Sequence, residues 1–418
     1  MRSWLDERLD LTRLNKKLLH KSFPVHHSFF LGEINLLAFI TLVLTGVFLS
    51  LYYEGSSRHV TLSGQSVPAA YASIVYIDSL PFGALLRRVH HWSAHVLVAG
   101  VVLHLLRVLL TGAYKNPREP NWLIGLALLG VTVMTSFVGY ALPDDAYAVT
   151  ATHIGYGIAS AIPWVGSWIA SVMFGGEYPT SYSLPRMLPV HILWLPLVLG
   201  LLLGLHLLIV IKQKHTQPRY ARVVAPHKIL GVPLVPQQAL MMSALFFIYL
   251  AVLFVVAGIA NPHPVQVFGP PTASTPSVKP DWYFLWIYGI LELIPSSWTF
   301  TILGQTFGPE VIGGMMIPGV IVAAGVALPF VDRSSRKGRY LEAPLEHPAR
   351  IGVTVWLLSF VATASMAGYH AELGLSVGLL QAALLIAPVA AGALAFGLVR
   401  ALASGSSRAS PPGRSITT

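Results

Sequence analysis

The chain alternates between long apolar stretches and polar connections. Eight of the apolar stretches are long enough to form a helix across a hydrocarbon core about 30 Å thick. They are residues 29–53, 88–110, 121–141, 187–211, 237–260, 310–331, 350–368 and 376–400. The pattern predicts an all-α integral membrane protein with eight transmembrane helices.

Three connections on one side of the predicted membrane are long, at 54–87, 142–186 and 261–309. Long ordered connections in a helix bundle commonly carry function. Two amphipathic segments within them, 155–173 and 282–294, are expected to lie along the membrane interface. The Pro-, Ser- and Thr-rich stretch 261–280 is expected to be an extended linker.

The connections also suggest how the chain is organised. An amphipathic basic segment (1–28) lacks the apolar core and cleavage site of a signal peptide. A four-helix domain (29–211) and a second four-helix domain (237–403) are joined by a basic, Pro-containing linker (212–236). The Ser-, Pro- and Arg-rich tail 404–418 is expected to be disordered.

Composition supports a membrane protein and restricts its chemistry. Hydrophobic residues make up 54% and charged residues 11%, whereas soluble domains carry about 25% charged residues. The chain contains no cysteine. Disulfides, iron–sulfur ligation and thioether-linked haem within this chain are therefore excluded.

The net charge of +10 follows the predicted topology and does not indicate nucleic-acid binding. If residues 1–28 are cytoplasmic, all but five of the 27 Lys and Arg residues lie on the cytoplasmic side. The five exceptions are Arg58, Arg87, Arg88, Arg186 and Lys279. The positive-inside rule then predicts that both termini are cytoplasmic and that the long connections lie outside.

Four histidines in two of the predicted spans are the main candidates for chemistry. His90 and His104 in the second span are 14 residues apart, and His191 and His206 in the fourth are 15 apart. At about 1.5 Å and 100° per residue, each pair returns to nearly one helix face after roughly 21–23 Å. The two spans run parallel, because one helix lies between them, so His90 is level with His191 and His104 with His206.

Ionisable side chains at membrane depth are commonly functional. One such histidine alone would more commonly be a hydrogen-bonded packing residue, but four in register predict two non-covalent b-type haems. The outer haem iron would be bound by His90 and His191, and the inner haem iron by His104 and His206.

Glycines near these positions repeat the same spacing. Gly32 and Gly46 in the first span, and Gly125 and Gly139 in the third, are also 14 residues apart. We expect each to let a porphyrin approach the backbone, although small residues for helix packing are the alternative.

Basic and additional histidine residues flank the predicted ligands. Arg87 and Arg107 lie three residues from His90 and His104, where each could pair with a haem propionate or anchor the helix at the interface. His91 and His95 point about 100° and 140° away from His90. They are expected to be structural or solvent-facing.

Four segments resemble cytochrome b of the bc1 and b6f complexes. They are Arg87–Ala94 (RRVHHWSA), Leu103–Arg107 (LHLLR), Gly139–Pro143 (GYALP) and Lys279–Phe284 (KPDWYF). The resemblance covers roughly residues 20–370. The 15-residue histidine spacing is similar to the b6 branch, but both halves form one polypeptide with an eighth helix, as in a bacterial hybrid.

The resemblance implies the cytochrome b subunit of a quinol–cytochrome c (or plastocyanin-like acceptor) oxidoreductase in the bacterial cytoplasmic membrane. Quinol would be oxidised at the outer face. One electron would pass to a Rieske iron–sulfur subunit and the other through the two haems to quinone near the cytoplasm, coupled to proton translocation. A c-type cytochrome subunit, surrounding lipid and a homodimeric complex are also implied.

The resemblance also implies an outer quinol site between the Pro280–Tyr283 motif and the end of the third span. Asp281 replaces the family's usual glutamate and would accept a proton from quinol. Tyr283 and Tyr140 would complete this catalytic site. Lys212, His215 and Lys228 are candidates for the cytoplasmic quinone site.

The chain departs from the family pattern at several positions. Glu292 stands where the family often has a basic residue, and Asp144 and Asp145 replace Trp and a small or polar residue. Phe30 stands where b6-type chains carry the cysteine that tethers an extra haem, so no covalent third haem is expected.

Two other functions remain open on the sequence. One is a different di-haem membrane electron carrier, which would share the histidine pairs but lack the Asp281 motif and the second half. The other is a proton-coupled transporter that uses buried histidines.

Overall fold

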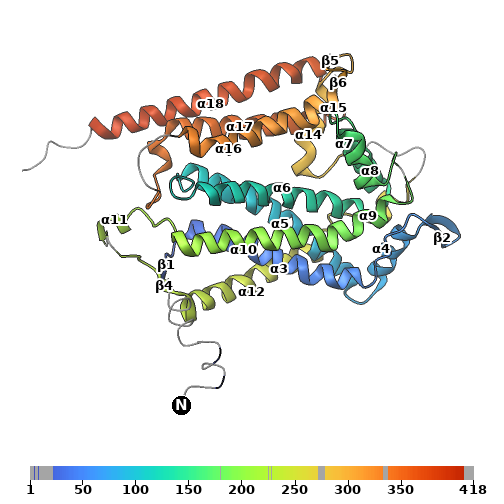
Figure 1. Cartoon of the computed structure of the whole chain (residues 1–418), viewed down its shortest axis with the longest axis horizontal. Helices are drawn as coiled ribbons and strands as arrows, with labels where there is room; N and C mark the ends of the chain where they lie inside the picture. The colour runs from blue at the N-terminus through green and yellow to red at the C-terminus, as the bar shows by residue number, and fades with distance from the viewer. Residues whose placement is uncertain are drawn as a thin grey trace, which may run out of the picture.

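The computed structural model describes Trp4, Arg8 and residues 22–408, apart from 179, 225, 227, 272–277 and 333–337. Long helices run side by side along the longest axis of the molecule (Figure 1). Among the described residues, eight helical segments are long and apolar enough to cross a membrane. The predicted all-α membrane fold with eight spans is therefore confirmed.

The first four spans form one half of the bundle. They are α3 (Phe30–Ser50), α5 (Gly83–Leu110), α6 (Glu119–Ala141) and α10 (Leu195–Gln213), which continues from α9 (Ser183–Pro189) through a π-helical turn, η3 (Val190–Trp194). Helix α3 packs against α5, and α6 packs against α10.

The second four spans follow a short linker. They are α12 (Ala239–Ile259), α16 (Ile317–Val331), α17 (Pro348–Ala367) and α18 (Val377–Arg408). Helix α12 packs against α5 of the first half, and α17 packs along α18. Short elements precede α12 and α16: β4 (Val232–Pro233) and η4 (Leu234–Gln238) before the former, α15 (Pro309–Val311) and η5 (Ile312–Met316) before the latter.

The three long connections lie at one end of the bundle, which we call the long-loop end. The first holds the hairpin β2 (His59–Leu62) and β3 (Gln65–Pro68) and helix α4 (Ala69–Ser79). The second holds α7 (Ala146–Ser160), α8 (Gly166–Phe174) and α9. The third holds α13 (Val265–Phe268), α14 (Trp282–Leu293) and the hairpin β5 (Phe300–Ile302) and β6 (Gln305–Phe307).

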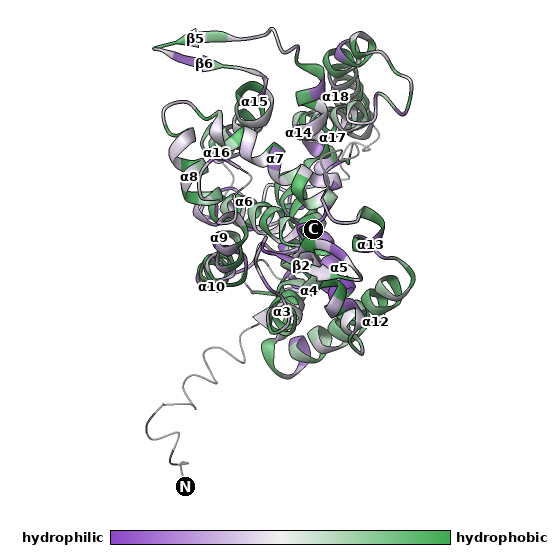
Figure 2. Ribbon diagram, turned by 90° about the vertical axis from the view of Figure 1, so that its right-hand side faces the viewer, coloured by the Kyte–Doolittle hydropathy of each residue, from purple (hydrophilic) through white to green (hydrophobic). Residues whose placement is uncertain are grey.

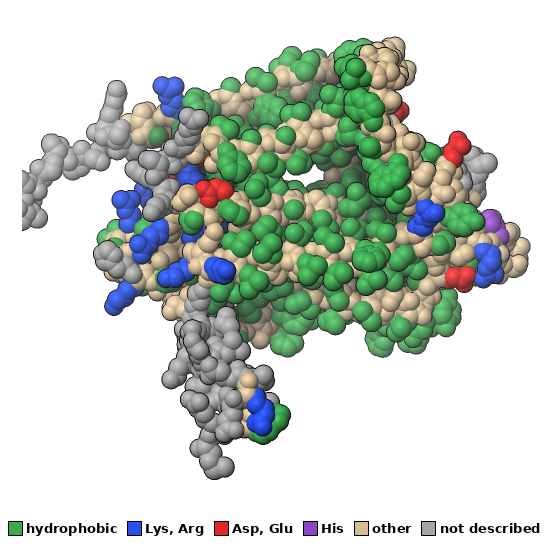
Figure 3. Space-filling model, in the orientation of Figure 1, with side chains coloured by type: hydrophobic (Ala, Val, Ile, Leu, Met, Phe, Trp, Pro, Cys, Tyr) green, Lys and Arg blue, Asp and Glu red, His purple; other side chains and the backbone are tan. Residues whose placement is uncertain are grey.

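We call the opposite end the basic end, because Lys and Arg side chains gather there (Figure 3). Its short elements are β1 (Ser22–Phe23), which pairs with β4, and η2 (His27–Phe29), α11 (Ala221–Val224) and η6 (Pro344–Glu346). Between the two ends the visible face is largely apolar (Figure 3). Exposed side chains of the spans include Leu201 and Leu208 on α10. This surface suits contact with acyl chains.

Several predicted boundaries differ from the structure. The interfacial segment at 155–173 is two helices, α7 and α8, separated by a turn at Pro163. The extended linker 261–280 contains α13, and its residues 272–277 lie outside the described part. Helix α18 continues to Arg408, so it includes the first residues of the tail predicted to be disordered. Residues 409–418 and most of 1–21 are outside the described residues.

Candidate functional site

The four predicted ligand histidines form two pairs, each with one ring from α5 and one from the η3–α10 helix. The ring centroids of His90 and His191 are 6.3 Å apart, and those of His104 and His206 are 6.4 Å apart, each with an interplanar angle of 69°. The structure thus brings together the same two pairs that the sequence predicts to be level with each other. The rings lie opposite each other across a gap and are too far apart to hydrogen bond directly.

Hydrogen bonds orient the pair at the long-loop end. The His191 Nδ1 lies 3.0 Å from the carbonyl oxygen of Thr135, which can only accept, so Nδ1–H donates. The His90 Nδ1 lies 2.9 Å from the Thr45 hydroxyl, which itself donates to the Thr41 carbonyl. His90 Nδ1–H is therefore also the donor. In both rings Nε2 is left unprotonated, as a metal ligand requires.

Three of the four predicted glycines lie directly against a ligand ring. A Cβ at Gly139 would lie 2.5 Å from His191 Cε1, while one at Gly46 or Gly32 would lie 3.3 Å from the Cε1 of His90 or His104. Gly125 instead faces Leu105. The missing side chains thus leave room for the imidazoles themselves.

Each histidine pair lines its own cavity, and each of the four glycines lines one of these two cavities. The two cavities share four wall residues at the middle of the bundle. These are Phe39, Leu97, Thr132 and Leu199. The cavities are therefore stacked along the helix axis with a thin, largely apolar wall between them.

The cavity at the long-loop end also reaches the Asp281 motif. His91, Tyr283 and Tyr140 line it together with His90 and His191. This one cavity thus joins a histidine pair to the predicted quinol-binding residues.

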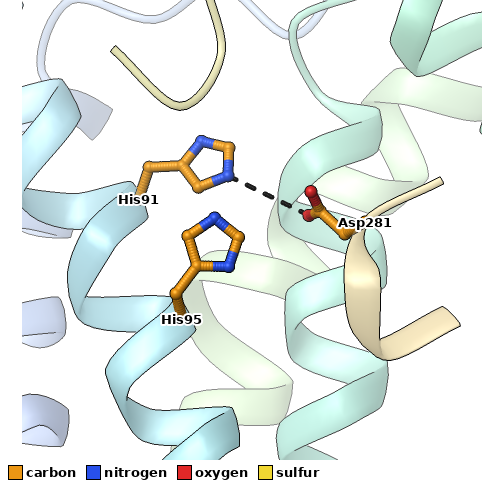
Figure 4. Close-up of side chains that lie close together, drawn as sticks. All are labelled: His91, His95 and Asp281. Carbon is orange, nitrogen blue, oxygen red and sulfur yellow. Dashed lines mark ion pairs between the residues drawn. The ribbon is translucent and has the colours of Figure 1, made fainter. Parts of the chain in front are cut away.

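Asp281 lies in a cluster of aromatic and imidazole side chains. Its Oδ1 accepts a hydrogen bond of 3.1 Å from the Tyr147 hydroxyl, and its Oδ2 accepts one of 2.8 Å from Tyr283. The Nε2 of His91 is 3.9 Å from Oδ2. His91 and His95 stack from one face of α5 toward the carboxylate on the other side (Figure 4).

Two family models match the chain. One, described as Cytochrome b(N-terminal)/b6/petB, covers residues 95–270, and the other, Cytochrome b(C-terminal)/b6/petD, covers 269–384. The cytochrome bc1 complex cytochrome b subunit of Streptomyces coelicolor is 36% identical over 85% of this chain and 67% of its own length. This chain belongs to the cytochrome b family.

Other relatives agree with this assignment. The cytochrome bc1 complex cytochrome b subunit of Mycobacterium tuberculosis is 32% identical over 88% of this chain and 69% of its own length. A chain of a solved structure, "Hyperthermophilic respiratory Complex III", has the same fold, with a TM-score of 0.71 at 23% identity. It covers 97% of this chain and 100% of its own. The resemblance inferred from the four segments is confirmed.

Membership of the cytochrome b family implies binding of haem b, and the histidine pairs fit an iron between them. A histidine nitrogen binds a transition metal at about 2.0–2.1 Å and lies about 1.1 Å from its ring centroid, so two axial rings should be roughly 6.2–6.4 Å apart. The observed 6.3 and 6.4 Å agree with this separation.

Unpaired buried polar atoms at the basic end of this cytochrome b also suit a bound group. Arg107 Nη2, Asn121 Oδ1 and Glu33 Oε2 have no hydrogen-bond partner among the described residues, although all three side chains line the cavity of His104 and His206. Buried polar atoms normally have partners. Arg107 is therefore placed to bind an anionic group such as a propionate.

Arg87 has a different environment from the one predicted. Its Nε and Nη2 donate to both carboxylate oxygens of Asp78, at 2.7 and 2.6 Å, and its Nη1 donates to the carbonyl of His263 at 3.1 Å. This buried bidentate pair ties α5 to α4. The guanidinium still lines the cavity at the long-loop end, but Asp78 already neutralises its charge.

The sequence predicts His91 and His95 to be structural or solvent-facing, and in the structure neither faces solvent freely. Both are partly buried and approach Asp281, and His95 Nδ1 accepts a 3.2 Å hydrogen bond from Trp282 Nε1. The helical periodicity correctly predicted that both side chains point away from the direction of His90. It could not show that α14, almost two hundred residues later, packs on that side.

The tyrosines around Asp281 are held as neutral hydrogen-bond donors. Burial, followed by the negative charge of Asp281, raises the pKa values of Tyr283 and Tyr147 above their ordinary range. The hydroxyls that donate to Asp281 are those of Tyr147 and Tyr283. The ring of Tyr140 packs on those of Tyr147 and Phe284, with 5.8 and 6.0 Å between ring centroids. It supports the wall of the site.

Asp144 and Asp145 have partners of their own, although His263, the partner of Asp145, packs on Tyr147 of the Asp281 cluster with 4.9 Å between ring centroids. Asp145 is fully buried, caps α7 by accepting from the Ala148 amide at 2.8 Å, and pairs with His263 at 2.5 Å. Asp144, at φ +50°, lies near Ser57 and His59. Burial raises the pKa of Asp144 to about 6, while the Ser57 hydroxyl opposes that shift.

Asp144→Asn should stabilise the protein more at pH 8 than at pH 5. The folded state binds the Asp144 proton more tightly than the unfolded state, so the contribution of the neutral carboxyl is lost as the pH rises through about 6. At pH 8 the difference is of order 3 kcal/mol at most. Thermal unfolding of the variant and of Glu54→Gln, an exposed carboxylate in the neighbouring loop, tests this. Equal gains at both pH values would contradict the burial argument.

At the basic end, one of the three candidate quinone contacts lines a cavity. His215 borders the cavity of His104 and His206, and its ring lies 5.8 Å from that of Phe29. Lys212 and Lys228 do not line that cavity.

Proposed function

We propose that this cytochrome b is the quinol-oxidising and quinone-reducing subunit of a bc-type respiratory complex, with quinol bound at the long-loop end. The observation that carries the proposal is the cavity that holds His90 and His191 together with His91, Tyr140 and Tyr283 beside Asp281. A quinol at the Tyr283 edge of this cavity would lie near the Asp281 carboxylate, which Tyr283 contacts, and next to a one-electron centre.

In the proposed reaction, Asp281 takes a proton from a quinol hydroxyl as quinol is oxidised. Two tyrosine hydroxyls, those of Tyr147 and Tyr283, donate to the two carboxylate oxygens and fix the orientation of the acid. Both tyrosines stay protonated, because burial and the carboxylate raise their pKa values. A positioned carboxylate of this kind acts as a general base.

Two b-type haems, when bound, would supply one-electron carriers stacked across the membrane. His90 with His191, and His104 with His206, would hold the irons, and Arg107 would bind a propionate at the basic end. Thr45 and Thr135 fix the tautomer of the ligands at the long-loop end. The shared wall of Phe39, Leu97, Thr132 and Leu199 would separate the two sites.

The proposal extends to location and partners. The Lys and Arg residues at the basic end support a cytoplasmic position for that end and both termini, in a bacterial cytoplasmic membrane. Without cysteine the chain cannot bind an iron–sulfur cluster or a thioether-linked haem. A Rieske subunit and a c-type cytochrome subunit are therefore proposed partners, in a complex that we propose to be a dimer.

Visible spectra of the purified, anaerobic complex test this function. We expect two b-type haems per chain that are reduced on addition of quinol, and no reduction by the dimethyl ether of the same quinol, which has no hydroxyl proton to release. Haem bands that do not respond to quinol would indicate another di-haem carrier. A spectrum without b-type bands would contradict the proposal and favour a transporter.

A further inference from the structure

The β5–β6 hairpin is an uncharged, apolar projection at the long-loop end. Strand β5 and the tip are exposed, with Phe300 43%, Ile302 50% and Leu303 84% accessible. No Asp, Glu, Lys, Arg or His occurs between Glu292 and Glu310. The hairpin is held by stacking of Phe300 on Phe307, at 4.9 Å between ring centroids.

The chain contains a second hairpin with the same turn but a polar tip. In β2–β3 the turn residues Ser63 and Gly64 have φ values of +49° and +82°, and in β5–β6 Leu303 and Gly304 have +50° and +76°. The sequences LSGQS (62–66) and ILGQT (302–306) also match in pattern. A leucine in the left-handed region is not required by this turn and is unfavourable there. Its presence at the tip indicates a role for an apolar side chain.

The two hairpins also point in different directions. β2–β3 extends outward beyond the helix ends, along the direction of the bundle (Figure 1). β5–β6 lies next to α15 at the long-loop end and extends sideways from the bundle, in the plane perpendicular to the helices (Figures 1 and 2). In a membrane, the first hairpin would enter water and the second would lie along the bilayer surface.

Neighbouring residues match the composition of a membrane interface. Trp298 precedes the hairpin, and Trp164 contacts its base, with its backbone N–H 3.4 Å from Gln305 Oε1 and its ring 6.3 Å from Phe307. Both indoles are more than half exposed. Tryptophans are enriched at the headgroup level of membrane proteins. The hairpin leads directly through α15 into α16, whose Val320 is an exposed, lipid-level side chain.

We propose that the β5–β6 hairpin is a membrane-interface anchor that inserts Ile302 and Leu303 into the phospholipid leaflet at the long-loop end. A two-stranded hairpin is at best marginally stable in water alone, and lipid contact would stabilise it by covering its apolar strand. The anchor would hold α14, and with it Asp281, at a fixed depth below the membrane surface. This binding surface is independent of the quinol chemistry.

Nitroxide accessibility in the whole complex, reconstituted in phospholipid nanodiscs, tests the proposal. Because this chain has no cysteine, Leu303→Cys, Ile302→Cys, Ser63→Cys and Val320→Cys each introduce one labelling site in it. The complex with the unsubstituted chain gives the background from other subunits. Ser63→Cys is the matched control for the same turn in water, and Val320→Cys is the reference for lipid.

We expect the labels at 302 and 303 to collide more with oxygen than with a water-soluble nickel chelate, as at 320, and the label at 63 to show the reverse. Dominant collision with nickel at 302 and 303 would place the hairpin in water and overturn the proposal. Low collision rates with both reagents and an immobilised spectrum would show that a protein subunit covers the hairpin, which would also overturn it.

Discussion

Replacing His206 by leucine is expected to lower the haem content from two b haems per chain to one. His206 is paired with His104 across its cavity, and the other histidine pair is roughly 21 Å away along the helices. Leucine cannot bind iron but keeps an apolar side chain in an apolar wall, so the bundle should still fold. A pyridine haemochrome assay on the purified complex measures the content.

The reciprocal variant, His191→Leu, should remove the other haem. Each single variant should therefore lose a different haem signal in low-temperature spectra. His153→Leu, which removes an exposed histidine of α7, is the matched control and should retain both haems. Loss of both haems from a folded single variant would contradict independent sites, and no loss would contradict the ligand assignment.

The histidine pairing could be predicted from the sequence, because it depends only on helix periodicity and on the parallel run of two spans. Fourteen or fifteen residues return a side chain to nearly one helix face whatever surrounds it. The same spacing marked Gly32, Gly46 and Gly139 as close-approach positions, but in the structure each lies against a histidine ring, whereas the sequence predicted a porphyrin there. Hydropathy likewise fixed the eight spans, because a membrane helix requires a long apolar stretch.

Contacts between distant connections could not be predicted in this way. Arg87 pairs with Asp78 because α4 packs against α5. The local sequence pattern of either helix does not predict this packing. Residues of the third long connection supply Asp281 and His263, which meet His91 and Asp145 only in the folded state. Spacing predicted which residues share a face of one helix, but not which later segment covers that face.

The structure also shows what two departures from the family pattern do. Asp144 and Asp145 replace uncharged residues beside the predicted quinol site, so in sequence they suggest added negative charge there. In the structure Asp145 is a helix cap bound to His263, and Asp144 belongs to the Ser57 and His59 region. A carboxylate near a site in sequence is therefore not necessarily available to it, so a test of proton transfer should concentrate on Asp281.

Asp281→Asn should slow quinol-dependent haem reduction by roughly 10²–10⁴-fold, the usual range for loss of a general base. Asparagine keeps the size of the side chain, and its carbonyl oxygen can still accept one of the two tyrosine hydrogen bonds. It cannot accept a proton from quinol. Stopped-flow reduction of the purified complex, with haem content measured in the same sample, gives the rate.

Three further variants separate a chemical role from a structural one. Asp281→Glu restores a carboxylate with one more methylene and should recover most of the rate. Asp144→Asn removes a buried carboxylate outside the Asp281 cluster and should leave the rate near normal. Tyr147→Phe removes one positioning hydrogen bond and should have an intermediate effect, with a change in pH profile if it alters the proton affinity of Asp281.

The decisive comparison is between the asparagine and glutamate variants at equal haem content. If the carboxylate accepts the proton, the rate must fall in the Asn variant and recover in the Glu variant. The reason is that a carboxylate can accept a proton from quinol, whereas an amide cannot. If Asn and Glu are equally slow, the shape of the aspartate matters and its basicity does not. If Asn is as fast as the native residue, the proton leaves the quinol by another group, and the assignment of Asp281 as the base is wrong.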